Sequence, residues 1–186
     1  ACAAEQILLG KADIMLAGGA DCGTDPLIVA QMAAAGVLGS HPQDPALACR
    51  PFHRDRDGMV LGDGAGFVVL ESAESVFSRN ARPIGLLAGW GMATGTGGRT
   101  GVEDDGSGLL RAMKEALRTA GCHPREIAYV NAHGTGTPLN DRGEFAAYEQ
   151  LFTGLRSPAA ISSTKPVTGH CLGATGALEA ILTLRA

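Results

Sequence analysis

The sequence is poor in two kinds of residue on which nucleic-acid binding depends. Aromatic residues make up 4% of its 186 residues, too few for platforms on which bases stack. The 15 lysines and arginines face 19 aspartates and glutamates, so the formal net charge is -4, and the basic residues are scattered. Because clustered positive charge binds phosphate backbones, we expect no nucleic-acid partner.

The chain also lacks an apolar run long enough to cross a bilayer, and no signal peptide is recognisable, so we expect no membrane association. The five cysteines are an odd number without metal-ligand spacing: Cys2, Cys22, Cys49, Cys122 and Cys171. This usage favours reduced thiols in a cytosolic or organellar-matrix setting over a disulfide framework. We expect a cytoplasmic protein without a metal site.

Glycine, in contrast, is abundant, and 27 glycines in a protein of α/β type indicate close backbone packing and tight turns. The first residues, ACAAEQILLG, are typical of the middle of a helix, and the chain stops at LEAILTLRA without a helix terminator. Although 186 residues can bury a sizeable core, we expect an internal fragment of a longer protein.

The segment 161–176, ISSTKPVTGHCLGATG, holds a lysine and a histidine five residues apart among small residues. Pro166 disfavours helical backbone at Lys165, which we predict to end a loop or strand. The small and apolar residues that follow predict a helix that begins near His170. The dipole of such a helix would keep His170 neutral, and a neutral ring can donate a hydrogen bond to a carbonyl oxygen that gains negative charge.

A second segment, 127–141, is IAYVNAHGTGTPLND. Its short apolar run predicts a buried strand, and His133 follows the end of that strand. Ligands of open α/β sheets collect beyond the carboxyl ends of strands, so chemistry is expected at His133. Asp141 and Glu144 fit an aspartate-led capping box that opens the next helix.

The pair NAHGTGTPLND and STKPVTGHCLGATGALEA resembles the β-ketoacyl-acyl carrier protein synthases, in particular the discrete elongating condensing enzymes. Two further blocks are similar to that family, GKADIMLAGGAD at 10–21 and RPFHRDRDGMVLGDGAGFVVLE at 50–71. The four blocks follow the family order and cover most of the chain. The resemblance implies an incomplete α/β fold of the thiolase-like, layered αβαβα type. Residues 1–82 would be the remainder of its N-terminal half and 83–186 the first part of its C-terminal half.

Local patterns predict the elements of both halves. We expect strands at 14–17, 66–71 and 84–91, and helices at 25–38, 72–79 and 109–120. The alternating charges of 50–58 indicate a solvated or ion-paired loop. The glycine-rich, acidic stretch 93–108 departs most from the family, which leaves contacts to a pantetheine arm unassigned there.

The resemblance implies a decarboxylative Claisen condensation that elongates a chain in fatty acid or polyketide biosynthesis. Malonyl-acyl carrier protein loses CO2, and the resulting enolate attacks an acyl group held on an enzyme cysteine. His133 and His170 match the paired histidines that stabilise charge on the thioester oxygen. Lys165 matches the lysine that favours this charge and helps to fix His133.

Motif position also suggests supporting residues. Glu144 is expected to pair with the Lys165 ammonium, Thr135 and Thr137 to bind the pantetheine amides, and Met32 to lie beside the acyl-chain pocket. The alternatives are that Glu144 only closes the capping box, that the threonines serve the turn, and that Met32 is an ordinary core residue.

The nucleophile is expected outside this chain. Cys2 lies only eight residues before Gly10, whereas in the family a full helix separates the nucleophile from that glycine. We therefore expect the isolated fragment to be inactive and to fold poorly, because a sheet cut at both ends exposes its edges. The resemblance further implies acyl carrier protein as partner, a homodimer, and no cofactor besides the phosphopantetheine arm that carries the substrates.

Three other readings remain open: a non-catalytic partner subunit of the chain-length-factor type, a ketosynthase domain of a modular synthase, and a glycine-rich binding or structural domain. The presence of His133, Lys165 and His170 together argues against the first, and the form of the motifs favours a discrete enzyme over the second. Mutation of either histidine in the complete protein separates the third from the enzymes.

Overall fold

A computed structural model of the chain describes residues 1–40, 44–95, 103–156 and 158–186. The helices and strands, with three short 3-10 turns, follow one another in this order: α1 (Cys2–Leu8), β1 (Ile14–Cys22), α2 (Pro26–Ala34), η1 (Pro45–Leu47), β2 (Asp63–Glu71), α3 (Ala73–Ser78), α4 (Ser107–Ala120), η2 (Pro124–Glu126), β3 (Tyr129–Asn131), α5 (Pro138–Leu151), β4 (Ala160–Ser162), α6 (Lys165–Thr168), η3 (Leu172–Ala174) and α7 (Thr175–Thr183).

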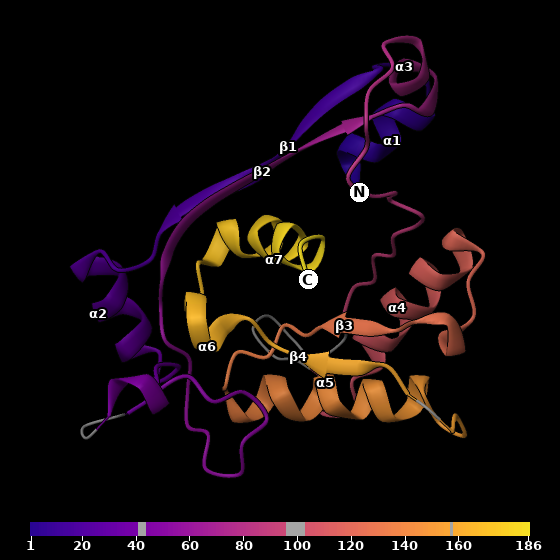
Figure 1. Cartoon of the computed structure of the whole chain (residues 1–186). Helices are drawn as coiled ribbons and strands as arrows, with labels where there is room; N and C mark the ends of the chain where they lie inside the picture. Colours follow the sequence, from indigo (N-terminus) through magenta and orange to yellow (C-terminus); the bar gives the residue numbers. More distant parts are fainter. Residues whose placement is uncertain (41–43, 96–102, 157) are drawn as a thin grey trace.

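β1 and β2 form an antiparallel pair, in register from Ile14 opposite Glu71 to Cys22 opposite Asp63. Both strands are longer than the predicted 14–17 and 66–71. One face of the pair packs against α7 (Figure 1). A Cβ at Gly64 would lie 2.7 Å from the Leu178 side chain, so glycine permits this close approach.

β3 and β4 form a parallel pair, with Tyr129 opposite Ala160 and Asn131 opposite Ser162. α7 lies between the two sheets. It packs on β1 and β2 on one side, and on the other side it accepts a hydrogen bond from Asn131 of β3, whose side chain donates to Thr183 Oγ1 at 3.0 Å. α5 covers the other face of β3 and β4, as Figure 1 shows. The described chain is therefore layered as β1–β2, α7, β3–β4 and α5.

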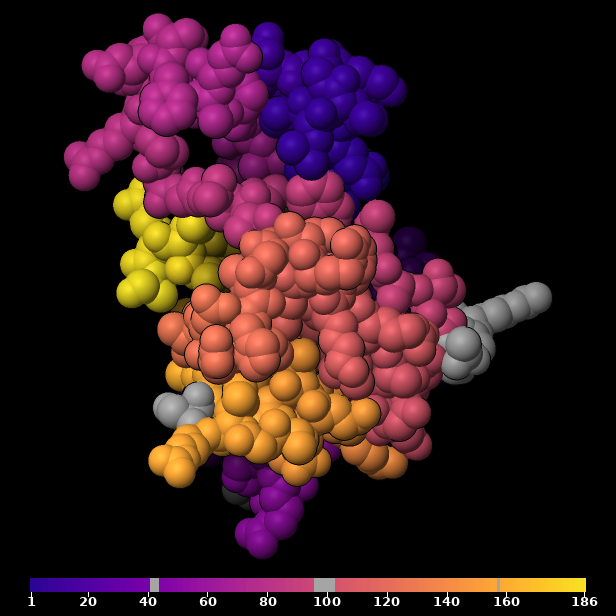
Figure 2. Space-filling model, turned by 90° about the vertical axis from the view of Figure 1, so that its right-hand side faces the viewer, coloured from indigo at the N-terminus to yellow at the C-terminus, as the bar shows by residue number. Residues whose placement is uncertain are grey.

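The buried core lies where α5 packs on the β3–β4 sheet. It is formed by four buried residues: Ala132, Tyr148, Phe152 and Ala159. The face of the β1–β2 pair that points away from α7 also carries apolar residues, but they are not buried: Leu16 is 66% exposed and Val69 is 64% exposed. In Figure 2, α1 and α3 form the upper end of the molecule, above α4 and α5.

The helices predicted at 25–38, 72–79 and 109–120 are found, although α2 ends at Ala34, four residues before the predicted end. α2 begins after Asp25, whose side chain accepts from Leu27 N at 2.9 Å. α3 begins after Ser72, which accepts from Ser75 N at 3.2 Å. α4 ends at Ala120, and Gly121 follows it with a φ of +66°, the expected left-handed cap.

The strand predicted at 84–91 is not found, because this segment pairs with no described strand. It lies instead along α4. Trp90 N donates to Thr119 Oγ1 at 3.1 Å, and the Thr119 hydroxyl donates back to Trp90 O at 3.0 Å. A Cβ at Gly91 would lie 2.0 Å from Ala112 O, so the backbone approaches the helix too closely for a side chain.

None of the described helices combines the length and apolar character required to span a bilayer. Of the predicted glycine-rich loop at 93–108, positions 96–102 fall outside the described residues.

Candidate active site

Two of the three predicted catalytic residues lie at one edge of the β3–β4 sheet. His133 follows β3 and Lys165 follows β4, and the carboxyl ends of parallel strands share an edge. His170 reaches the same place from the turn after α6. The His133 and His170 rings lie 5.2 Å apart between centroids, edge to face at 87°. The structure thus brings all three predicted residues together.

Lys165 is the most deeply buried charged side chain of this group, with 1% of its surface exposed. It opens the one-turn helix α6, so the extended backbone predicted for it is wrong. Pro166 is compatible with this because the first turn of a helix needs no N–H donor from proline.

The three N–H donors of the Lys165 ammonium meet three acceptors on neighbouring residues. It bonds to Glu179 Oε1 at 2.5 Å, to His133 O, and to His133 Nδ1 at 3.3 Å. An ammonium can only donate, so Nδ1 of His133 accepts, and the neutral ring carries its proton on Nε2. The lysine therefore determines which nitrogen of His133 is a donor.

The partner of Lys165 is Glu179 of α7, and the prediction that Glu144 fills this role is wrong. Glu179 lies within the GATGALEA block, fourteen residues after the lysine, so the motif contained it. No local pattern links the two residues, because only the packing of α7 against the sheet edge brings them together.

Glu144 instead holds the backbone that carries His133. Its carboxylate accepts from His133 N at 2.6 Å and from Gly134 N at 2.7 Å. The Tyr148 hydroxyl and the Asn140 amide donate to it as well, at 2.6 and 3.3 Å. A buried carboxylate with four donors is well satisfied, and it fixes the peptide planes on both sides of the His133 Cα atom.

The capping box predicted from Asp141 and Glu144 is also wrong, because α5 begins earlier, at Pro138, with Thr137 before it. Asp141 therefore lies within the first turn of the helix. Its buried carboxylate accepts from Gly136 N at 3.2 Å and from Phe52 N at 2.7 Å. Asp141 thus ties the turn after His133 to a distant loop.

His170 is held by neutral groups. Its Nδ1 accepts from Leu172 N at 3.1 Å and lies 3.1 Å from the Thr175 hydroxyl. The backbone N–H can only donate, so the neutral ring carries its proton on Nε2, as in His133. The helix predicted from His170 begins only at Thr175, after the 3-10 turn η3. Its dipole is therefore not the main influence on the ring.

Both imidazoles favour the neutral form. Packing around the ring, followed by the nearby Lys165 ammonium, lowers the pKa of His133 from 6.5 to about 4, although by solvent-accessible surface the residue as a whole is exposed. Burial, then His133 and Lys165, lowers the pKa of His170 to about 4. Desolvation and nearby positive charge both penalise the imidazolium. At neutral pH the site offers two neutral Nε2–H donors.

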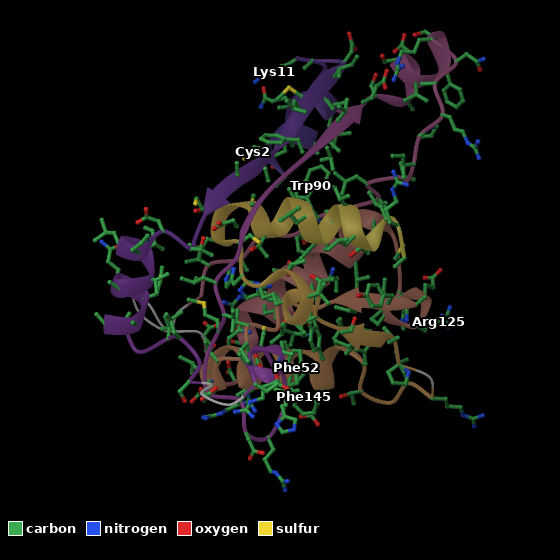
Figure 3. The ribbon with its side chains drawn as sticks, turned by 60° about the vertical axis from the view of Figure 1, so that its left-hand side comes forward. Cys2, Lys11, Phe52, Trp90, Arg125 and Phe145 are labelled. Carbon is green, nitrogen blue, oxygen red and sulfur yellow. The ribbon has the colours of Figure 1, made fainter. Side chains whose placement is uncertain are left out.

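The other predicted residues lie on separate segments of the chain, the turn after β3, helix α2 and helix α1. Thr135 is buried beside Thr137, and their hydroxyls lie 2.9 Å apart. Met32 lies in α2, and Cys2 begins α1, next to the β1–β2 hairpin and away from Phe52 (Figure 3). Binding roles for Thr135, Thr137 and Met32 remain predictions. Among the described residues, no cluster of three histidine, cysteine or acidic side chains is suited to a metal ion.

The fold is that of thiolase-like ketosynthases. A solved type II polyketide ketosynthase, in complex with its acyl carrier protein, superposes with a TM-score of 0.94 at 34% identity, over 99% of this chain and 45% of that chain. A β-ketoacyl synthase from Burkholderia phymatum superposes with a TM-score of 0.90 at 39% identity, over 99% of this chain and 44% of the other.

The chain belongs to the β-ketoacyl synthase family. The family's C-terminal domain matches residues 84–186, and its N-terminal domain matches 1–75. The 3-oxoacyl-[acyl-carrier-protein] synthase 2 of Vibrio cholerae is 44% identical over 183 residues, which are 98% of this chain and 44% of that protein. The enzyme of the same name from Synechocystis is 41% identical over 177 residues, 95% of this chain and 42% of that protein. The chain thus spans less than half the length of these relatives.

Proposed function

We propose that the protein to which this chain belongs catalyses the decarboxylative condensation of malonyl-acyl carrier protein with an enzyme-bound acyl thioester. The observation that carries this proposal is the pair of neutral imidazoles, 5.2 Å apart, whose Nδ1 atoms are both occupied as acceptors. Their Nε2–H groups are left to donate to a substrate.

The chemistry requires such a pair. When the malonyl thioester loses CO2, the electrons of the broken C–C bond form an enolate, and negative charge collects on the thioester oxygen. Donors that are already aligned stabilise this charge more than water does, because they need no reorganisation during the reaction. His133 and His170 would be these donors, and the Lys165 ammonium adds favourable potential while it keeps the tautomer of His133.

The remaining parts of the proposal rest on the relatives' names and on the motif resemblance. Several of these relatives bear the name 3-oxoacyl-[acyl-carrier-protein] synthase, and one solved ketosynthase is bound to its acyl carrier protein. We propose the same partner here, with substrates carried on its phosphopantetheine arm and no other cofactor. Thr135 and Thr137 would contact that arm, and Met32 the acyl chain. The acyl group would be held on a cysteine other than Cys2, in a homodimeric, cytoplasmic enzyme, and the chain would comprise parts of two halves, 1–82 and 83–186.

The test measures decarboxylation of malonyl-acyl carrier protein by the full-length protein and by its His133→Ala and His170→Ala variants. Loss of one aligned donor is expected to lower the rate at least about a hundredfold, corresponding to about 3 kcal/mol. His123→Ala is the matched control, because His123 precedes η2 and its ring caps that turn.

Unchanged decarboxylation in both site variants would refute the proposal and favour a binding or structural domain whose histidines only pack. Full decarboxylation without condensation would instead indicate a partner subunit.

A further inference from the structure

One segment outside the proposed chemistry touches both histidine-bearing stretches. We call residues 50–62, RPFHRDRDGMVLG, the frame segment. It belongs to the part of the chain matched by the family's N-terminal domain, whereas His133 and His170 belong to the part matched by the C-terminal domain. No side chain of the frame segment takes part in the proposed reaction.

The far end of the frame segment holds the backbone of His170. His170 N donates to Val60 O at 2.7 Å, and Gly62 N donates to His170 O at 3.1 Å. These two bonds form an isolated parallel bridge between Leu61 and His170. The main chain of His170 is thus fixed from both sides by the frame segment.

The near end of the segment packs on the turn that follows His133. A Cβ at Gly134 would lie 3.1 Å from the Phe52 ring, and a Cβ at Gly136 would lie 2.7 Å from Gly58 O. Both glycines have positive φ, +43° and +81°, so a side chain would be strained here as well as crowded. The Phe52 amide completes the contact through its bond to Asp141.

Arg56 joins these parts. Its Nη1 donates to His53 O at 2.9 Å within the segment, and its Nη2 donates to Pro138 O at 3.2 Å at the start of α5. Its Nε lies 3.3 Å from Asp141 Oδ2, whose side chain is fully buried. A buried carboxylate needs a compensating partner, and Arg56 forms the ion pair found for Asp141 in the described parts of the chain.

We infer that the frame segment sets the spacing of the two histidines, and that Arg56 is its positioning residue. Arg56 acts through Asp141, which holds Gly136 of the His133 turn, while Val60 and Gly62 hold His170. This inference rests on the proposed function, because the spacing matters only if both rings serve one oxygen.

The experiment uses the full-length protein with Arg56→Met, Arg56→Lys and, as control, Arg54→Met. Arg54 lies in the same segment, but its side chain is 92% exposed and lies 3.9 Å from Asp55 in an ion pair. Both kcat and KM for malonyl decarboxylation are measured, together with acyl transfer from carrier protein to the cysteine and the thermal unfolding midpoint.

We expect Arg56→Met to lower kcat for decarboxylation by about ten- to a hundredfold, as small misplacements of aligned groups do, with KM unchanged. Acyl transfer should stay within about twofold, since the histidine pair is not proposed to drive that step. Arg56→Lys keeps the charge but not the planar set of donors, so we expect an intermediate kcat. Arg54→Met should match the wild type.

Several outcomes separate this inference from the proposed function. A wild-type protein without decarboxylation refutes the proposed function itself. An active wild type with an unchanged kcat in Arg56→Met overturns the inference alone, as does an equal loss of acyl transfer and decarboxylation, which marks a general structural role. If Arg56→Met does not fold, Arg56→Lys decides, and a wild-type kcat in that variant overturns the inference.

Discussion

The two histidines of the site lie side by side but are held by different interactions, charged groups at His133 and neutral hydrogen bonds at His170. His133 is surrounded by charge, because its Nδ1 and carbonyl oxygen meet the Lys165 ammonium and its amide meets the Glu144 carboxylate. His170 is held by a backbone bridge and by the neutral donors Leu172 N and Thr175. In neither arrangement do the described residues give Nε2–H a hydrogen-bond partner.

The comparison shows that an Nε2–H donor can be held in place by buried charges or by neutral hydrogen bonds, and that the two arrangements differ in what the loss of one partner costs in free energy. Charged groups buried around His133 are stabilising only as a complete set, since each of them is expensive without its partners. The neutral bonds around His170 are individually weak and partly redundant. Substitutions near His133 should therefore have large effects, and those near His170 small ones.

Removal of the ammonium should have the largest effect. Lys165→Met leaves Glu179 and the His133 carbonyl without their donor, so we expect the free energy of unfolding of the full-length protein to fall by about 3–5 kcal/mol. Urea unfolding measures this value. Lys11→Met, at an exposed position, should change it by less than about 0.5 kcal/mol.

A second substitution sharpens this result. Glu179→Gln in the Lys165→Met background removes the orphaned carboxylate and should restore part of the stability. If the double variant were less stable than Lys165→Met, the two residues would not be coupled as an ion pair.

Neutralisation of the carboxylate under His133 should have the next largest effect. Glu144→Gln has one acceptor oxygen where the carboxylate serves four donors, and its own NH2 would face N–H groups. We expect a loss of about 1.5–3 kcal/mol in the free energy of unfolding, the value of hydrogen bonds to charged groups. Glu149→Gln, on the exposed side of α5, is the control. Equal stability of the two variants would contradict the comparison.

Substitution beside His170 should have a modest effect. Thr175→Val removes one neighbour of Nδ1, but the Leu172 amide still donates to it. We expect the decarboxylation rate to fall by about two- to tenfold, equivalent to about 0.5–1.5 kcal/mol. Thr175→Ser keeps the hydroxyl and should retain the rate. A loss as large as that of His170→Ala would show that the backbone donor alone does not hold the ring.

The pH dependence of stability tests both histidines at once. The pKa of both histidines is about 4 in the folded protein and near 6.5 when unfolded, so the unfolded chain binds more protons between these values. Their contribution is therefore complete above pH 6.5 and declines as the pH falls toward 4. Urea midpoints at pH 5 and 7 measure it, and the difference between them should shrink in His133→Asn and His170→Asn. An unchanged difference would mean that the rings already titrate normally.

Much of the local structure follows from the sequence alone. The amphipathic pattern of 109–120 and Gly121 define α4 and its end, because helix periodicity and a left-handed glycine cap depend on neighbours in the chain. The same is true of His133 at a strand end, since a short apolar run followed by glycines has few other folds. The segment 84–91 is the counterexample. Its apolar pattern is that of a strand, but pairing depends on partners, and here the backbone lies on α4.

The sequence by itself singled out the three candidate site residues, since His133, Lys165 and His170 stand in motifs that resemble those of the condensing enzymes. Only the tertiary structure decided what holds them. Glu179 reaches Lys165 because α7 packs between two sheets, and Asp141 reaches Phe52 because a loop 89 residues away folds over α5. Hydrogen bonds between distant residues depend on where packing places them, and no local pattern in the chain encodes that placement.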